Sequence, residues 1–196
     1  MGMRVGLTGG VASGKSTVSK LLTELGAVVI DGDLLAREVV ARGTPGLAQV
    51  IDEFGSSLLT PEGDLDRAAL GALVFSDESA RKRLEAIVHP LVYQRVVELE
   101  AQAPADGVVV HDIPLLAETG RADTFDAVIV VDAPADVQLD RMLRDRGWTR
   151  ADAESRMAAQ VSREDRRAIA TYVIDNTGSL DELRARVVEV YDAITG

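Results

Sequence analysis

The chain has 196 residues, a net charge of −11 and no cysteine, and 46% of its residues are hydrophobic. This length and composition fit one α/β core with insertions better than two full domains. The lack of cysteine excludes disulfide bonds and thiolate metal sites, and the acidic balance disfavours a nucleic-acid partner. No apolar run approaches 20 residues, and a signal peptide has no room before the first strand. We therefore expect a cytoplasmic protein with no membrane partner and no obligate protein partner.

The first predicted elements flank a glycine-rich segment. Residues 4–7 form a short apolar run typical of a strand, and residues 15–25 carry apolar side chains at helical spacing. Between them, residues 9–16 read Gly-Gly-Val-Ala-Ser-Gly-Lys-Ser, which matches the phosphate-loop pattern G-x-x-x-x-G-K-[ST]. The alternative is a tight glycine-rich turn with an exposed lysine, but the strand before it and the helix after it favour phosphate binding.

The chemistry of such a loop follows from its residue types. Glycines let successive backbone N–H groups point at phosphate oxygens, and the helix N-terminus adds a partial positive charge. The pattern places Lys15 at the β- and γ-phosphates and the Ser16 hydroxyl at a magnesium ion. We therefore predict a protein that binds a nucleoside triphosphate together with Mg²⁺.

Four further strands are predicted over residues 27–30, 107–110, 127–131 and 171–174. Their short β-branched runs are typical of strands buried on both faces of a parallel sheet. Ligands of open α/β sheets bind at the carboxyl ends of the strands. The polar side chains that the sequence delivers to this edge are Asp31, Asp33, Asp112, Asp132, Asp175 and Asn176. Some of them should be turn formers or helix caps, and Asp132, just before Ala-Pro, fits that role best.

Two helical insertions interrupt this pattern. About 75 residues separate the second and third strands, far more than a crossover needs. They read as helices over residues 34–42, 46–54, 67–75 and 79–101, the last interrupted at Pro90, and Asp64-Leu-Asp66 offers a cap for the third. A second, arginine-rich insertion contains Trp148 and has the character of a closing lid. The last helix, over residues 179–194, is expected to cover the sheet.

These elements predict an α/β fold of the P-loop NTPase type: a parallel sheet flanked by helices, with a helical substrate-binding insertion and a helical lid. We expect one domain over residues 1–196. Its core would comprise residues 1–33, 105–136 and 168–196. The acceptor-binding insertion would comprise residues 34–104, and the lid residues 137–167.

Among phosphate-loop proteins, the sequence favours a small-molecule kinase. No Asn-Lys pair exists, so the guanine-reading N-K-x-D of GTPases is absent, and the D-x-x-G match over residues 52–55 follows no strand. Motor ATPases usually need a larger core. A kinase needs a carboxylate near the acceptor hydroxyl, and Asp33, two residues past the second strand, is the best candidate. Asp31 is expected to support the loop.

Three other residues have two interpretations. Asp112 fits the Walker-B role of holding Mg²⁺, directly or through water, and the alternative is a capping or buried-turn aspartate. His89 precedes Pro90, and a histidine beside a helix-breaking proline is more often structural than functional. His111 is expected to pack or form hydrogen bonds, because two histidines without cysteines make a poor zinc site.

Besides the phosphate-loop pattern, which many kinases share, the chain contains a series of short motifs in order from about residue 3 to residue 180. They are the ten residues from Thr8 to Thr17, Asp31-Gly-Asp33 with Arg37, Phe54-Gly55, Gly63-Asp-Leu-Asp-Arg67 with Val74-Phe75, His89-Pro90-Leu91, Pro114-Leu-Leu116 with Glu118, Gln138-Leu-Asp-Arg141 and Val173-Ile-Asp-Asn176. In these motifs the chain resembles the dephospho-CoA kinases. Their combination is much more specific than the loop alone.

The resemblance implies ATP-dependent phosphorylation of the 3′-hydroxyl of dephospho-CoA, the last step of coenzyme A synthesis. It implies that six loop residues hold the ATP phosphates: Ala12, Ser13, Gly14, Lys15, Ser16 and Thr17. It also implies a lid arginine, Arg141, that reaches these phosphates, and it puts Asn176 beside the adenine. Asp33 would be the catalytic base. The acceptor would lie near Thr8, Asp33, Arg37, His89, Pro90 and Leu115.

Three positions depart from the usual pattern of that family. Gly32 stands where Ala is common, and Ala117 replaces a frequent Phe, which would loosen the pocket near Leu116. Asp145 occupies the place of a second lid arginine, so Arg144 or Arg146 would have to act instead. The alternative functions are another P-loop small-molecule kinase, such as a nucleoside monophosphate kinase, and a regulatory protein that binds ATP without turnover.

Overall fold

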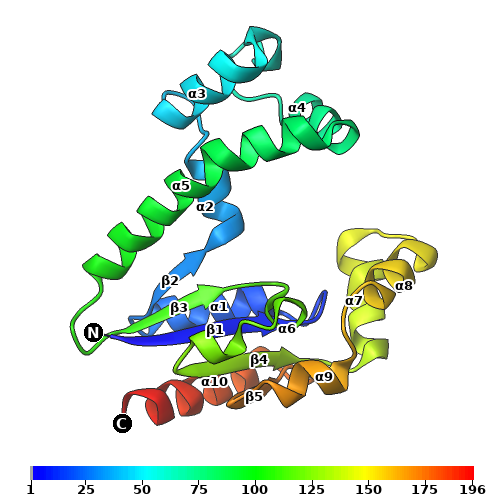
Figure 1. Ribbon diagram of the computed structural model, residues 1–196. Coiled ribbons are helices and arrows are strands. Elements are labelled where there is room, and N and C mark those ends of the chain that lie inside the picture. Colours follow the sequence, from blue (N-terminus) through cyan, green and yellow to red (C-terminus); the bar gives the residue numbers. More distant parts are fainter. Residues whose placement is uncertain (1) are drawn as a thin grey trace. The chain divides into compact units, whose positions relative to one another are not determined.

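A five-stranded parallel sheet forms the core of one part of the computed structural model, which describes residues 2–196 (Figure 1). Its strands are β1 (Met3–Gly9), β2 (Val28–Asp31), β3 (Val108–Asp112), β4 (Ala127–Asp132) and β5 (Tyr172–Asp175). Their order is β2-β3-β1-β4-β5, and β1 pairs in parallel with both β3 and β4. The loop that follows β1 therefore leaves the middle of the sheet, where ligands of such folds bind.

The sheet is covered on both faces because its strands are apolar on both. In β4, Ile129 and Val131 belong to a core with helices α1 (Lys15–Glu24) and α10 (Leu180–Thr195). Val128 and Val130, which alternate with them along the strand, pack instead with Leu116 of the short helix α6 (Leu116–Thr119). Successive strand residues point to opposite faces, so a continuous apolar run is the pattern that a doubly covered strand requires.

The remaining helical elements of this part are η2 (Ala122–Thr124), α7 (Ala135–Arg146), α8 (Arg150–Ala158) and α9 (Arg163–Ala168). Side-chain caps define where α8 and α9 begin. Thr149 accepts a hydrogen bond from the N–H of Asp152 at the start of α8, and Ser162 accepts one from Asp165 at the start of α9. These caps satisfy N–H groups that have no partner within the helix. The lid predicted over residues 137–167 thus contains most of α7, followed by two short helices that each have a side-chain cap.

The chain divides into two compact units: the described residues up to Ile30 with Ala103–Gly196, and Asp31–Gln102. The second unit contains α2 (Gly32–Glu38), α3 (Pro45–Phe54), η1 (Ser56–Leu58), α4 (Arg67–Ser76) and α5 (Glu78–Gln102). It has its own core, built around Val40, Leu47, Val50 and Leu70. Because this core is independent of the sheet, the insertion folds around its own apolar contacts. None of the helices within residues 2–196 has the length and apolar character that a membrane span requires.

Helix α5 corrects one prediction, since it runs without a break through Pro90. Proline removes one backbone N–H and disturbs the preceding turn, which disfavours a helix interior by about 3 kcal/mol. Pro90 itself is exposed, whereas Leu84, Ile87 and Val88 of the same helix pack against the core of this unit. Apolar contacts on that side hold the helix together across the proline.

Candidate active site

The loop between β1 and α1 has the backbone of an anion-binding site. Ala12 has a φ of +56° and Gly14 a φ of +93°, both in the left-handed region. The N–H of Ser13 donates to the carbonyl of Gly10 at 3.0 Å, which closes the loop on itself. Alternation of right- and left-handed residues turns successive N–H groups inward, and the left-handed alanine is a strain of the kind found at functional loops. This geometry suits a polyphosphate at the N-terminus of α1.

Lys15 pairs with Asp112, which lies at the end of β3. Its Nζ forms an ion pair with Oδ1 of Asp112, and the Ser19 hydroxyl donates to Oδ2 at 3.1 Å. Asp112 is only 5% exposed and lies beside Leu7 of β1 in the sheet register. The strand end therefore holds the lysine of the loop in place. The alternative prediction for Asp112, a capping or turn role, is not what its side chain does.

Arg141 and Asn176 hold the middle of the loop from the other side. Nη1 of Arg141 donates to the carbonyls of Ala12 and Ser13 at 3.4 and 3.3 Å. Nδ2 of Asn176 donates to the same Ser13 carbonyl at 2.7 Å. A Cβ on Gly14 would lie 2.1 Å from that amide nitrogen, so only glycine fits there. The structure thus brings Arg141 and Asn176 to the phosphate loop, as the predicted ATP site requires.

The first part of the loop is enclosed by side chains that the sequence analysis gave no role. A Cβ on Gly10 would lie 2.2 Å from Nε2 of Gln138 and 3.1 Å from Nη2 of Arg166. The N–H of Val11 donates to Oε1 of Gln160 at 2.9 Å. Gln138 precedes Arg141 by three residues on α7, a spacing that puts both on one helix face and could have indicated its position. No periodicity in the sequence pointed to Gln160.

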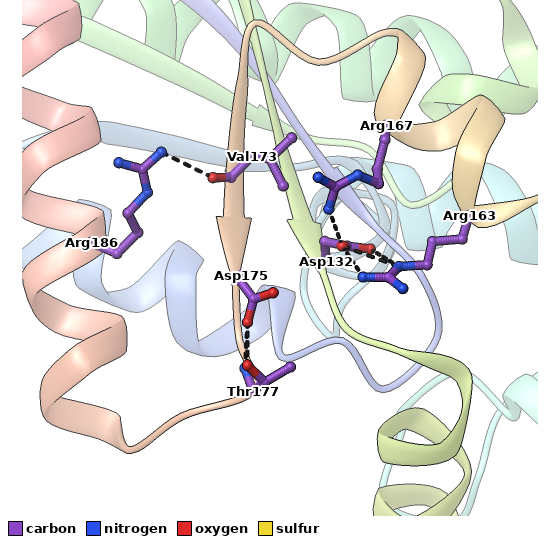
Figure 2. A network of polar contacts seen from close by, with 7 residues as sticks. All are labelled: Asp132, Arg163, Arg167, Val173, Asp175, Thr177 and Arg186. Atoms are coloured by element: carbon purple, nitrogen blue, oxygen red, sulfur yellow. Dashed lines mark hydrogen bonds and ion pairs between the residues drawn. The ribbon is translucent and has the colours of Figure 1, made fainter.

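Asp132 at the end of β4 is the centre of an ion-pair cluster rather than a turn or cap residue. Figure 2 shows Arg163 and Arg167 of α9 converging on its carboxylate. Arg163 binds it through Nε at 2.9 Å and through Nη2 at 2.7 Å. Burial raises the pKa of Asp132, but hydrogen bonds from the two arginines outweigh burial and hold that pKa below its usual range. The cluster fastens α9 to the sheet edge, so the predicted turn role was wrong.

Three further residues of this unit were singled out from the sequence: Thr8, Leu115 and His111. Thr8 is fully buried in β1, and its hydroxyl donates to the carbonyl of Pro114 at 3.3 Å. Leu115, next along the chain, is 50% exposed. His111 packs with its ring centroid 5.4 Å from that of Phe125, in line with the predicted packing role.

The other predicted acceptor residues, Asp33, Arg37, His89 and Pro90, belong to the second unit. Asp31 accepts a hydrogen bond from the N–H of Leu34 and caps α2, so its side chain supports the start of this helix rather than a loop. Asp33 lies exposed in the first turn of α2, and Arg37 follows one turn later. Carboxylate and guanidinium four residues apart share a helix face.

Helix α5 of the same unit carries His89 and Pro90, both of them exposed. Tyr93 and Val97 are 72% and 45% exposed, and with His89 they recur every four residues. They therefore lie along one side of the helix. The sequence analysis gave Tyr93 no role, because the sequence of this helix does not distinguish an exposed apolar side chain from a packed one.

The residue set near Lys15 fits a magnesium ion. Ser16 contributes a hydroxyl in the first turn of α1, and Asp112 contributes carboxylate oxygens with lone pairs beyond those used by Lys15 and Ser19. Hydroxyl, carboxylate, water and phosphate oxygens are the ligands that Mg²⁺ prefers. Within residues 2–196, no group of three or more His, Cys, Asp or Glu side chains could hold a metal. An ion here would therefore take most of its ligands from the nucleotide and from water.

Similarity to known proteins covers nearly the whole chain. The sequence profile of the dephospho-CoA kinase family matches residues 3–182. The dephospho-CoA kinase of Streptomyces avermitilis is 57% identical over 189 residues, which cover 96% of this chain and 92% of that protein. Among solved structures, TT1252 from Thermus thermophilus is 36% identical with a TM-score of 0.76, and covers 97% of this chain and 96% of its own. The dephospho-CoA kinase of Campylobacter jejuni is 28% identical with a TM-score of 0.69, and covers 100% of this chain and 98% of its own.

Proposed function

The chain belongs to the dephospho-CoA kinase family, and we propose that it transfers the γ-phosphate of ATP to the 3′-hydroxyl of dephospho-CoA, giving CoA and ADP. The observation that carries this proposal is the phosphate loop at the centre of the sheet, with Lys15 paired to Asp112. In the reaction, the bond from the γ-phosphorus to the β–γ bridging oxygen breaks, and the 3′-oxygen bonds to phosphorus. The hydroxyl proton passes to a base. Such a transfer depends mostly on positioning and charge stabilisation.

The phosphate end of ATP would be held by the loop and its neighbours. The proposed contacts are the six residues Ala12, Ser13, Gly14, Lys15, Ser16 and Thr17. Arg141 already lies within hydrogen-bond distance of two loop carbonyls, so a small rotation of its guanidinium would present it to a phosphate. Asn176, fixed on the Ser13 carbonyl, would lie beside the adenine. Lys15 and Arg141 would stabilise the negative charge of the transferred group.

Magnesium would be held by the Ser16 hydroxyl and by Asp112, directly or through water. When bound, the ion neutralises charge on the β- and γ-phosphates and fixes their geometry. The ion pair of Asp112 with Lys15 would keep the carboxylate and the ammonium group in register with the same phosphates.

Asp33 would accept the proton of the 3′-hydroxyl. Its exposed position in the first turn of α2 leaves the carboxylate open to a substrate, while Asp31 fixes that turn by capping it. Thr8, Arg37, His89, Pro90 and Leu115 would contact the acceptor. The exposed face of α5 that includes Tyr93 offers apolar surface of the kind that the long pantetheine arm would cover.

ATP and dephospho-CoA are the partners named by this proposal. The net charge of −11 argues against a nucleic-acid partner, because a strongly acidic protein repels phosphate backbones. A cytoplasmic location and the absence of an obligate protein partner remain predictions from the sequence.

The test compares acceptors. The purified protein is given Mg-ATP with dephospho-CoA, AMP or CMP, and ADP release is followed for each. We expect release that depends on dephospho-CoA and is at least about tenfold faster than with the two short nucleotides, since binding energy from the pantetheine arm raises turnover. Preference for AMP or CMP would overturn the proposal in favour of a nucleoside monophosphate kinase. Tight ATP binding without turnover on any acceptor would favour a regulatory protein.

A further inference from the structure

The turn between α8 and α9 contacts the phosphate loop directly. Oε1 of Gln160 accepts a hydrogen bond from the backbone N–H of Val11 at 2.9 Å, across 149 residues of sequence. Val11 is the second of the four variable residues in the loop pattern. A backbone N–H in a loop of this kind needs a partner, and here the partner is an amide side chain from the lid region.

The turn that carries Gln160 is itself fixed by two other elements. The N–H of Val161 donates to Oε1 of Glu118 from α6 at 3.2 Å. The carbonyl of Val161 accepts from Nη1 of Arg166 at 2.9 Å. Both backbone groups of Val161 are therefore held by side chains from different helices. This arrangement gives a structural role to Glu118, the acidic residue of the Pro-Leu-Leu-x-Glu motif.

Arg166 links the turn to the loop a second time. It is only 7% exposed, and its Nη2 would lie 3.1 Å from a Cβ on Gly10. One guanidinium thus contacts the turn through Val161 and reaches the loop at Gly10. The same short segment of the lid region thus bonds Val11 through Gln160 and lies close to Gly10 through Arg166.

We propose that Gln160 is a positioning residue for phosphoryl transfer, which fixes the first half of the phosphate loop before ATP binds. This inference rests on the proposed function for its kinetic consequence, but its effect on ATP binding does not depend on the acceptor. A loop that is already ordered loses less conformational freedom when it closes around the phosphates. Phosphoryl transfer is sensitive to such ordering because catalysis of this reaction is mostly positioning.

The amide of Gln160 suits this role better than a carboxylate would. A neutral carbonyl oxygen accepts the Val11 hydrogen bond without adding negative charge beside a polyphosphate site. Glu118, which carries a charge, accepts its hydrogen bond from Val161, the residue after Gln160. The acceptor of the Val11 N–H is thus the neutral side chain of the two.

The experiment compares Gln160→Met with Gln49→Met. The first variant keeps side-chain length but removes the acceptor, whereas Gln49 is exposed on α3 and serves as the matched control. In Gln160→Met we expect ATP to bind about fivefold more weakly by calorimetry, the effect of one ordinary hydrogen bond. The KM for ATP should rise by a similar factor, while the KM for dephospho-CoA stays within about twofold. The Val11 amide should exchange with solvent faster by at least about fivefold.

A second variant tests whether the turn that carries Gln160 must itself be fixed by Glu118. Glu118→Leu removes the acceptor for the Val161 N–H, and we expect it to weaken ATP binding in the same direction. Because the two side chains act on one turn, the double variant should lose less than the sum of the single losses. This variant also provides the test if Gln160→Met does not fold.

Two results would overturn the inference. One is unchanged ATP affinity and unchanged Val11 exchange in Gln160→Met. The other is an equal rise in the KM for both substrates together with a lower melting temperature, which would mark a general loss of stability. If the wild-type protein fails to phosphorylate dephospho-CoA, the proposed function fails, but ATP binding and Val11 exchange still decide the role of Gln160.

Discussion

Arg141 and Asn176 converge on one carbonyl of the phosphate loop. Nη2 of Arg141 donates to the backbone carbonyl of Asn176 at 2.7 Å, and both side chains donate to the carbonyl of Ser13. Helix α7 and the segment after β5 are thereby joined through the loop. A substrate that binds the loop would therefore be in contact with two elements that are far apart in the sequence.

Asn176→Ala should loosen the loop. The substitution removes a donor that is 8% exposed and leaves the Ser13 carbonyl without its shortest hydrogen bond. We expect the free energy of unfolding to fall by about 1–2 kcal/mol and ATP affinity to fall about five- to tenfold. Urea denaturation and calorimetry measure the two effects, with Gln49→Ala as the control. Unchanged ATP affinity would show that the Asn176 contact plays no part in nucleotide binding.

Asp132→Asn should destabilise the protein at neutral pH, because it leaves Arg163 and Arg167 without their carboxylate. We expect a loss of about 1–2 kcal/mol, less than for a fully buried pair, since both arginine side chains are 45% exposed. Urea denaturation of both proteins at pH 7 measures this difference.

The same variant should change how stability depends on pH. The folded pKa of Asp132 lies below its unfolded value, which is near 4. The stabilisation is therefore fully present above about pH 4 and is lost as the pH falls through the folded pKa. The gap between wild type and Asp132→Asn should be constant from about pH 5 to 7 and shrink below about pH 4. A gap that widens in acid would contradict the ion-pair assignment.

Asp33→Ala should remove the base while leaving ATP binding intact. We expect turnover to fall by at least about 10², the lower end of general-base effects, with ATP affinity within about twofold of wild type. Asp52→Ala is the matched control, since Asp52 is an exposed aspartate of the same unit. Near-normal turnover in Asp33→Ala would remove this residue from the mechanism.

Trp148 should report on closure of the lid. It is the only tryptophan, and the guanidinium carbons of Arg146 and Arg156 lie 5.3 and 4.4 Å from its ring centroid. Binding that redirects either arginine would change the surroundings of the indole. We expect its emission to change when ATP and dephospho-CoA are both present. An emission spectrum that stays the same with both substrates would argue against movement of the predicted lid.

The strands were predictable because their physical signal is local. Each predicted strand is present with small shifts at its ends, and β4 illustrates why: residues 127–131 are apolar without a break, as a doubly covered strand requires. The start of α4 was equally predictable, because the cap expected from Asp64-Leu-Asp66 is present and is supplied by Asp66. The break at Pro90 was wrong because packing along one side of α5 outweighs the local penalty of proline.

The contacts between distant side chains were not predictable in this way. Asp132 looked like a turn residue beside Ala-Pro, and its partners lie 31 and 35 positions further along the chain. Gln160 has no neighbours in sequence that mark it, and only the path of the chain brings it to Val11. The positions of Arg141 and Asn176 beside the phosphate loop were predictable because the resemblance to a known family carries such long-range information. The roles of Asp33, Arg37 and His89 at the acceptor stay predictions.

The most direct test of the account is the identity of the product. The purified protein is incubated with Mg-ATP and dephospho-CoA, the nucleotide products are separated, and their masses are measured by mass spectrometry. We predict equal amounts of ADP and a product heavier than dephospho-CoA by about 80 Da, one HPO₃ unit, as phosphoryl transfer requires. Phosphorus NMR should place the new monoester on the 3′-oxygen. ADP formed with inorganic phosphate and unmodified dephospho-CoA would contradict the central claim.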